Sequence, residues 1–143
     1  MNAPAYTPEI LRLTTSLALD SRLAEPMGSV ERRSPVCGSR ITVDVRLDDQ
    51  GRVSEAGMLV RACAFGQASA ALLDAGIVGR SAEELAAVRD GFAAWLSGAA
   101  NAPPAWPDLE LLAPALRHKG RHAAMLLPFE AAAEAAALAG KQG

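Results

Sequence analysis

Cysteine, clustered positive charge and long apolar runs are all scarce in this sequence, and each scarcity excludes a class of protein. Two cysteines among 143 residues allow at most one disulfide. Because the amino terminus shows no export signal, both are expected to be reduced thiols. The net charge of −2, without a strong local cluster of Lys and Arg, argues against nucleic-acid binding. No uncharged apolar run approaches the roughly 20 residues of a membrane span. We therefore expect a cytoplasmic protein that binds neither nucleic acid nor membrane.

Recognisable catalytic motifs are absent as well. The sequence contains no glycine-rich phosphate loop, no Ser-His-Asp arrangement and no His-Glu-x-x-His pattern. Its candidate carboxylates fall on predicted exposed faces or in a turn, where carboxylates are normally solvated. These residues are Glu83, Glu84, Asp44, Asp48 and Asp49. What remains is a composition of 50% hydrophobic and 21% charged residues, which fits one globular domain spanning residues 1–143.

The strongest periodic pattern predicts a strand, a turn and a second strand in the first half of the chain. Apolar and polar residues alternate from Ile41 to Leu47, the period of two that places one face of a strand on a core. Residues 49–51 supply a turn, and residues 53–60 continue as a second strand, so the pair is predicted to form an antiparallel hairpin. The segment 56–58 suits a bulge. The polar stretch 29–34 is either an edge strand or a loop.

Helical patterns lie on both sides of this hairpin. The predicted helices cover residues 8–19, 63–75, 81–97, 109–116 and 128–139. Ser81 begins a capping box that fixes the start of the third of these. Because proline suits the first turn of a helix but not its interior, the last helix is expected to start near Pro128 or to be kinked there. Strands followed by a run of helices indicate an α+β fold, with a small antiparallel β-sheet of about three strands packed against several helices.

Cys37 and Cys63 flank the predicted hairpin, each about 13 residues from Gln50. Pairing around the turn is therefore expected to bring both thiols to the same edge of the sheet. Cys63 also opens a helix, whose partial positive charge favours the thiolate that binds metal or acts as a nucleophile. Free cysteines also commonly pack as small buried hydrophobes. The spacing alone does not decide between these two interpretations.

Two cysteine-containing segments frame the hairpin. Pro35-Val36-Cys37-Gly38 precedes its first strand, and Cys63-Ala-Phe-Gly-Gln-Ala-Ser-Ala follows its second. With the Asp-Gln-Gly turn between them, residues 35–70 resemble the amino-terminal domains of the IscU, SufU and NifU family of iron–sulfur cluster assembly scaffolds. The family pattern is Pro-x-Cys-Gly-Asp, a hairpin, and a Cys-x-x-x-x-Ala-Ser segment that opens a helix. The resemblance implies an IscU/NifU-like fold for the whole chain.

The sequence departs from this family at two positions. The third family motif is Lys/Arg-His-Cys followed by small and apolar residues, and residues 121–126 match it with His122 at the histidine position. Ala123 stands where the family has its third cysteine. Ser39 replaces the family's aspartate after Cys-Gly. The resemblance therefore implies a degenerate ligand set.

The matching residues suit a small metal or cluster site. By the resemblance, Cys37, Cys63 and His122 are the expected ligands for iron, for a transient [2Fe–2S] cluster, or for zinc in the resting protein. Two thiolates and one imidazole suit zinc or iron(II), with the fourth position filled by water, by Ser39 or by a partner's ligand. The basic residues 117–121 are interpreted as a solvated loop.

Three functions follow from the resemblance and its departures. The first is a non-enzymatic scaffold or carrier that receives iron and sulfur and passes the cluster on, with a cysteine desulfurase and cluster-accepting proteins as its partners. The second is a degenerate paralogue that binds a desulfurase or another assembly factor as a regulatory module, as the loss of ligands at Ser39 and Ala123 suggests. The third is a sulfur relay in which Cys63 accepts persulfide sulfur.

Overall fold

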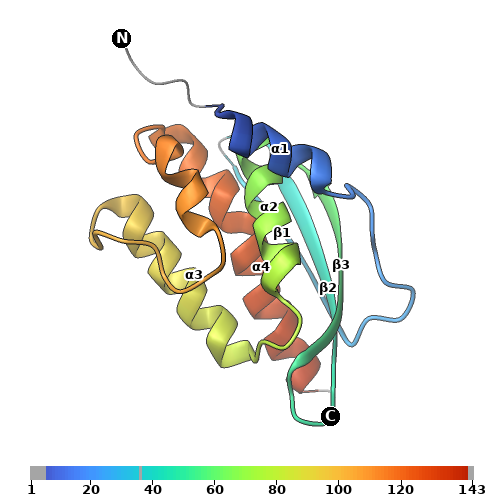
Figure 1. The fold of residues 1–143 in the computed structure, drawn as a ribbon. Coiled ribbons are helices and arrows are strands. Elements are labelled where there is room, and N and C mark those ends of the chain that lie inside the picture. The colour runs from blue at the N-terminus through green and yellow to red at the C-terminus, as the bar shows by residue number, and fades with distance from the viewer. Residues whose placement is uncertain (1–5, 36, 142–143) are drawn as a thin grey trace.

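The computed structural model, which describes residues 6–35 and 37–141, has a small antiparallel sheet packed against helices (Figure 1). The helices are α1 (Pro8–Ser16), α2 (Ala64–Gly76), α3 (Ala82–Ser97) and α4 (His122–Gly140), with 3₁₀ turns η1 (Leu109–Ala115) and η2 (Lys119–Arg121). The strands of the described sheet are β1 (Gly28–Arg33), β2 (Arg40–Leu47) and β3 (Val53–Arg61), in that order. The α+β class is confirmed, and most of the stretch 29–34 belongs to the edge strand β1, which ends at Arg33. The predicted domain limits of 1–143 include residues 1–5 and 142–143, which lie outside the described ranges.

The hairpin forms as predicted, with one correction to its register. Pairing is regular from Arg40↔Arg61 to Arg46↔Glu55, but Leu47 then pairs with Val53, so the extra residue is Ser54. The bulge expected at residues 56–58 is therefore wrong. Gly57 serves close packing instead, because a Cβ there would lie 2.1 Å from the backbone oxygen of Ser21.

The last helix begins earlier than expected. α4 starts at His122, so the prediction of a start near Pro128 is wrong and this proline lies inside the helix. An interior proline leaves the carbonyl four residues earlier without its helical donor. Packing offsets this local cost, because most of the residues around Pro128 lie in the core. The Ser69 hydroxyl of α2 also holds the helix by donating to the next carbonyl, that of Met125, at 2.6 Å. Burial also accounts for the apolar composition of this segment. Residues 119–140 have the length and apolarity of a membrane span, yet 61% of their most apolar stretch is buried inside the fold.

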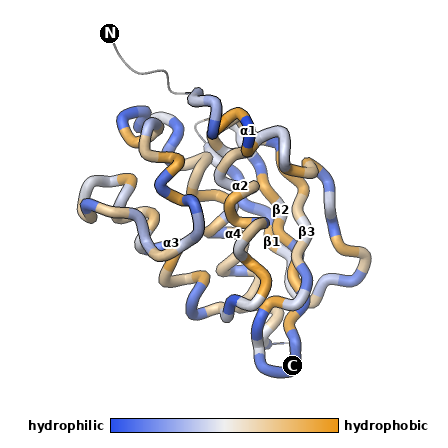
Figure 2. Tube along the Cα trace, viewed as in Figure 1, coloured by the Kyte–Doolittle hydropathy of each residue, from blue (hydrophilic) through white to orange (hydrophobic). Residues whose placement is uncertain are grey.

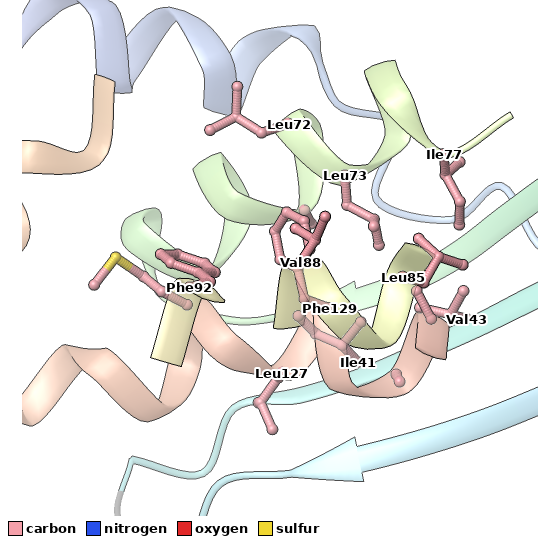
Figure 3. Packing of buried hydrophobic residues seen from close by; sticks show 14 of the residues in the cluster. Ile41, Val43, Leu72, Leu73, Ile77, Leu85, Val88, Phe92, Leu127 and Phe129 are labelled. Carbon is pink, nitrogen blue, oxygen red and sulfur yellow. The ribbon is translucent and has the colours of Figure 1, made fainter. Parts of the chain in front are cut away.

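The core lies between the sheet and the helices, and Figure 3 shows side chains of several elements meeting there. β2 contributes Ile41 and Val43, which are fully buried. Phe92 of α3 meets Phe129 of α4 edge to face, with ring centroids 5.2 Å apart. The capping box predicted at Ser81 is present. The buried residues of α3 are Leu85, Val88, Phe92, Trp95 and Leu96.

Asp44 contradicts the expectation that it would be solvated. It alternates onto the outer face of β2, yet it is fully buried because the segment after α1 crosses this face. Arg22 binds both carboxylate oxygens, at 2.9 and 3.0 Å, and Ser29 and the Leu23 N–H donate to the same group. Burial alone would raise the pKa of Asp44, but these donors outweigh it and lower the pKa. This carboxylate is a structural anchor.

The two ends of the sheet differ in what they carry. At one end, a pocket is lined by Asp49 and Gly51 of the β2–β3 turn and by Gly140, so α4 finishes beside this turn. Figure 2 shows hydrophilic residues gathered at the turn. The start of α4 therefore lies toward the opposite end, where Arg40 pairs with Arg61. We call this the cysteine end.

Candidate functional site

Strand pairing brings both cysteines to the end of the sheet where Arg40 pairs with Arg61. Cys37 precedes Arg40 by three residues and Cys63 follows Arg61 by two, and these two arginines are paired neighbours on β2 and β3. The structure thus brings the two segments to one edge of the sheet, as pairing around the turn predicted. Both cysteines are free thiols and both are partly exposed. Neither is a fully buried hydrophobe.

Cys37 lies in a tight loop held by two serines. The Ser34 N–H donates to the Ser39 carbonyl at 2.8 Å, and the Gly38 N–H donates to the Ser34 carbonyl at 3.1 Å. Gly38 has a φ of +74°, which a residue with a side chain rarely adopts. The loop is therefore a compact turn around the thiol. Val36, part of the predicted motif, lies outside the described residues.

The same serines favour the thiolate form of Cys37. The Ser34 hydroxyl is the main cause that lowers the pKa of the Cys37 thiol, and the Ser39 hydroxyl, whose Oγ lies 3.2 Å from Sγ, adds to it. Partial burial opposes this shift, and the positive charge of Arg121 supports it. Hydroxyl donors stabilise the charged form of an acid, as a positive charge does. Ser39, the residue that replaces the family's aspartate, thus contributes to the site by lowering the pKa of Cys37.

Cys63 is the N-cap residue of α2. Its backbone is extended, with φ −65° and ψ 171°, and its carbonyl accepts the first helical hydrogen bond from the Gln67 N–H at 2.9 Å. Within the described residues its side chain makes no capping hydrogen bond, so the sulfur is not used to complete the helix. The first turn of α2 lies beside the start of α4, because a Cβ on Gly66 would lie 3.4 Å from the Ala124 oxygen, an ordinary contact distance.

His122 occupies the first position of α4, beside this contact. Its Nε2 lies 2.7 Å from the Leu116 carbonyl oxygen. A carbonyl only accepts, so Nε2 carries the hydrogen, and the Nδ1 of the neutral ring keeps its lone pair. Metal-binding histidines commonly donate their second ring N–H to a carbonyl in this way. His118, by contrast, is stacked on Phe65 with ring centroids 6.0 Å apart, a packing role.

The three predicted ligands lie in segments that meet at the cysteine end, but they are not gathered around one point. Among residues 6–35 and 37–141, no three His, Cys, Asp or Glu side chains lie close enough together to hold a metal ion. Ala123, where the family has a cysteine, is partly exposed in the first turn of α4. The ligand set Cys37, Cys63 and His122 stays a prediction.

Two residues that act on Cys37 were not foreseen from the sequence. Ser34 lies three residues before the cysteine, a spacing at which a serine hydroxyl can accept from a backbone N–H later in the same turn, and the sequence shows this spacing. Arg121 was assigned to a solvated basic loop. Its effect on Cys37 depends on how α4 meets the sheet, which no local pattern reveals.

Comparison with known proteins identifies relatives of the whole chain. The profile of the family described as "NifU-like N terminal domain" matches residues 14–103, a range that includes both cysteines and ends before His122. A solved NifU-like protein (N-terminal) from Brucella abortus is 32% identical, with 97% of this chain and 96% of that chain covered and a TM-score of 0.89.

A second solved structure shares the fold at lower identity. It is a putative iron–sulfur cluster assembly scaffold protein for the SUF system from Fervidobacterium islandicum, 16% identical, with 92% of this chain and 96% of that chain covered and a TM-score of 0.82. No curated protein shows a significant match to this sequence.

Proposed function

This chain belongs to the NifU-like N-terminal domain family, and from that premise we propose that it is a non-enzymatic scaffold or carrier for iron–sulfur clusters. Its cargo is iron or a nascent [2Fe–2S] cluster, which it receives and passes on. The observation that carries the proposal is the Arg40↔Arg61 pairing, which brings the segments of Cys37 and Cys63 to one end of the sheet.

The residues at the cysteine end fit this cargo in part. Cys37 supplies a thiol whose lowered pKa favours the metal-binding thiolate. Cys63 supplies a second sulfur that the helix start does not use. His122 supplies Nδ1, with its ring held by the Leu116 carbonyl. Iron in these clusters is held mainly by thiolates, and with Ala123 in the third cysteine's place the chain offers too few for a closed site. We propose that a partner completes the ligand set.

This incomplete set suits transient holding better than storage. A cysteine desulfurase is the proposed source of sulfur, and a cluster-accepting protein is the proposed recipient. Either partner supplies a ligand while it is docked, so the cluster stays labile on the free chain. A ligand set completed in this way links loading and release to partner exchange.

Anaerobic reconstitution tests the proposal. The protein is incubated with iron, cysteine and a desulfurase, and iron, acid-labile sulfide and the absorption spectrum are measured. While the desulfurase is present, we expect a stoichiometric cluster that is lost in Cys37→Ala and in Cys63→Ala. His122→Ala should weaken cluster retention, whereas His118→Ala, a matched histidine that stacks on Phe65, should retain it.

Two outcomes would replace the proposal. If neither iron nor sulfide is retained under any condition while the desulfurase still binds, the chain is a regulatory binding module. If mass spectrometry finds a persulfide on Cys63 in the absence of iron, the chain is a sulfur relay.

A further inference from the structure

Three arginines stand in register across the sheet at the cysteine end. Arg33 of β1 pairs with Arg40 of β2, and Arg40 pairs with Arg61 of β3. Residues directly opposite in an antiparallel ladder share a face, and neighbouring strands lie about 4.8 Å apart. Arg40 alternates with the buried Ile41, so the three side chains lie on the outer face, away from the helices. We call these residues the arginine row.

The arginine row borders a pocket next to the Cys37 loop. This pocket has a volume of about 460 Å³. Its lining residues are Arg33, Ser34, Pro35, Gly38, Arg40 and Arg61. The loop that carries Cys37 therefore forms one wall, and the arginine row forms the other. A group bound to the row lies beside the candidate cargo site.

The row carries more positive charge than its surroundings neutralise. Glu31 is shared, with its Oε1 3.3 Å from the Nε of Arg33 and 3.3 Å from the Nε of Arg40. Arg61 forms no ion pair with any residue in the described part of the chain. Asp44, the buried carboxylate on the same face, is already bound by Arg22. Three positive charges thus face one shared negative charge.

The three adjacent arginines lower the stability of the isolated protein, and their side chains do not contribute to the hydrophobic core. Like charges directly opposite one another on neighbouring strands repel. The side chains of Arg33 and Arg40 are 65% and 40% exposed, and Arg61 is also exposed, so none fills the interior. An anion from outside the chain would relieve the repulsion and use the fork-shaped donors of the guanidinium groups.

We propose that the arginine row is the docking site for a carboxylate-rich segment of a protein partner. Sites for small molecules usually enclose the ligand among converging polar groups, whereas these arginines are spread over three strands and remain open to solvent. A protein segment matches that spread. Residues three or four apart on a helix have Cβ atoms about 5–6 Å from each other, close to the strand spacing of the row, so glutamates at this spacing lie on one side of a helix. If this docking serves the exchange of a cluster, that role rests on the proposed function. The binding of the acidic segment to the row does not depend on it.

The test uses the metal-free protein and a labelled peptide. The peptide carries glutamates at helical spacing, a matched peptide carries glutamines, and binding is followed by fluorescence anisotropy at low ionic strength. We expect only the glutamate peptide to bind, with an affinity that falls as salt is added. Arg61→Gln should weaken binding roughly tenfold, the loss expected for one charge-assisted contact.

A matched control distinguishes an effect of the arginine row from an effect of the protein's net charge. Arg46 lies on β2 with Arg40, at the turn end of the same face, so Arg46→Gln removes the same charge elsewhere. It should leave peptide binding unchanged. Arg61→Gln should melt at the same or a higher temperature than the parent protein, because it removes repulsion. A lower melting temperature would show the row to be structural.

Other results would overturn the proposal. Equal weakening by Arg46→Gln and Arg61→Gln would reduce the effect to net charge, and no binding of the glutamate peptide would remove it. Tighter binding of citrate or of a short oligonucleotide to the row would assign it to another class of ligand. Because no metal is present, a failure of cluster assembly leaves this test unaffected.

Discussion

At the level of single residues, the loop around Cys37 favours the thiolate form of its side chain. Ser34 and Ser39 surround the thiol within a loop of six residues, and their hydroxyls lower the pKa of Cys37 against the opposing effect of burial. A protein that binds a metal through a thiolate gains from a thiol with a lowered pKa, because proton release then competes less with metal binding.

We predict that Ser34→Ala raises the pKa of Cys37. Removing the hydroxyl that contributes most to thiolate stability leaves Ser39 and Arg121 to oppose burial. The experiment follows the rate of iodoacetamide alkylation against pH in a Cys63→Ser background, where Cys37 is the remaining thiol of the sequence. The midpoint should move to higher pH, and alkylation at neutral pH should slow.

The control is Ser54→Ala, in the bulge near the turn, whose hydroxyl donates to the Arg46 carbonyl. It should leave the alkylation midpoint where the parent has it. Identical midpoints for Ser34→Ala and the parent would show that the Ser34 hydroxyl does not act on the thiol.

At the level of elements, residues with strong local patterns were predicted well and those governed by tertiary packing were not. The alternation from Ile41 to Leu47 fixed a strand, and the Ser81 capping box fixed the start of α3. The start of α4 was misplaced because Pro128 is a strong local stop, which burial and the contact from Ser69 outweigh. Asp44 was misassigned because its cover comes from a segment that carries no periodic pattern.

The features of the candidate site also fall into those that local sequence patterns predicted and those that depend on tertiary packing. The approach of the Cys37 and Cys63 segments followed from counting residues about the turn. The contribution of Ser34 and Arg121 did not, because it depends on loop and helix placement. The sequence shows no charge cluster at the arginine row, because its members lie far apart in the sequence and become neighbours only through strand pairing.

Close packing of β1 on α4 gives a prediction at this level. A Cβ on Gly28 would lie 2.1 Å from the Ala135 oxygen and 2.9 Å from the Ala139 nitrogen. Both atoms are backbone and cannot rotate away, so the helix must move off the strand. Gly28→Ala should therefore lower the free energy of unfolding by about 3 kcal/mol, the upper part of the usual cost of overpacking. Urea denaturation followed by circular dichroism measures it.

Gly140→Ala is the matched control for this substitution. Gly140 lies in α4, the helix that Gly28 contacts. A Cβ on Gly140 would meet nothing within 4 Å, and its φ is not positive. Alanine should be neutral or slightly stabilising at that position, because it favours the helix over glycine. Equal stability of Gly28→Ala and the parent would mean that β1 and α4 are not packed as closely as described.

At the level of the whole molecule, the two ends of the sheet carry different elements and residues. The turn end holds the finish of α4 and hydrophilic residues, as Figure 2 shows. The cysteine end gathers the starts of α2 and α4, the Cys37 loop and the arginine row. The predicted ligands therefore come from three separate elements. A metal that binds all three joins β1–β2, α2 and α4, so binding and global stability are coupled.

We predict that zinc stabilises the metal-free protein through this coupling. A ligand that binds only the folded state at a free concentration 100 times its Kd adds about 2.7 kcal/mol, so the melting temperature should rise on adding zinc and fall back with a chelator. Cys37→Ala and Cys63→Ala should each abolish the gain. Protons compete with metal for thiolates, so the gain should shrink as pH falls. An equal gain in the parent and in both cysteine variants would place zinc elsewhere on the molecule.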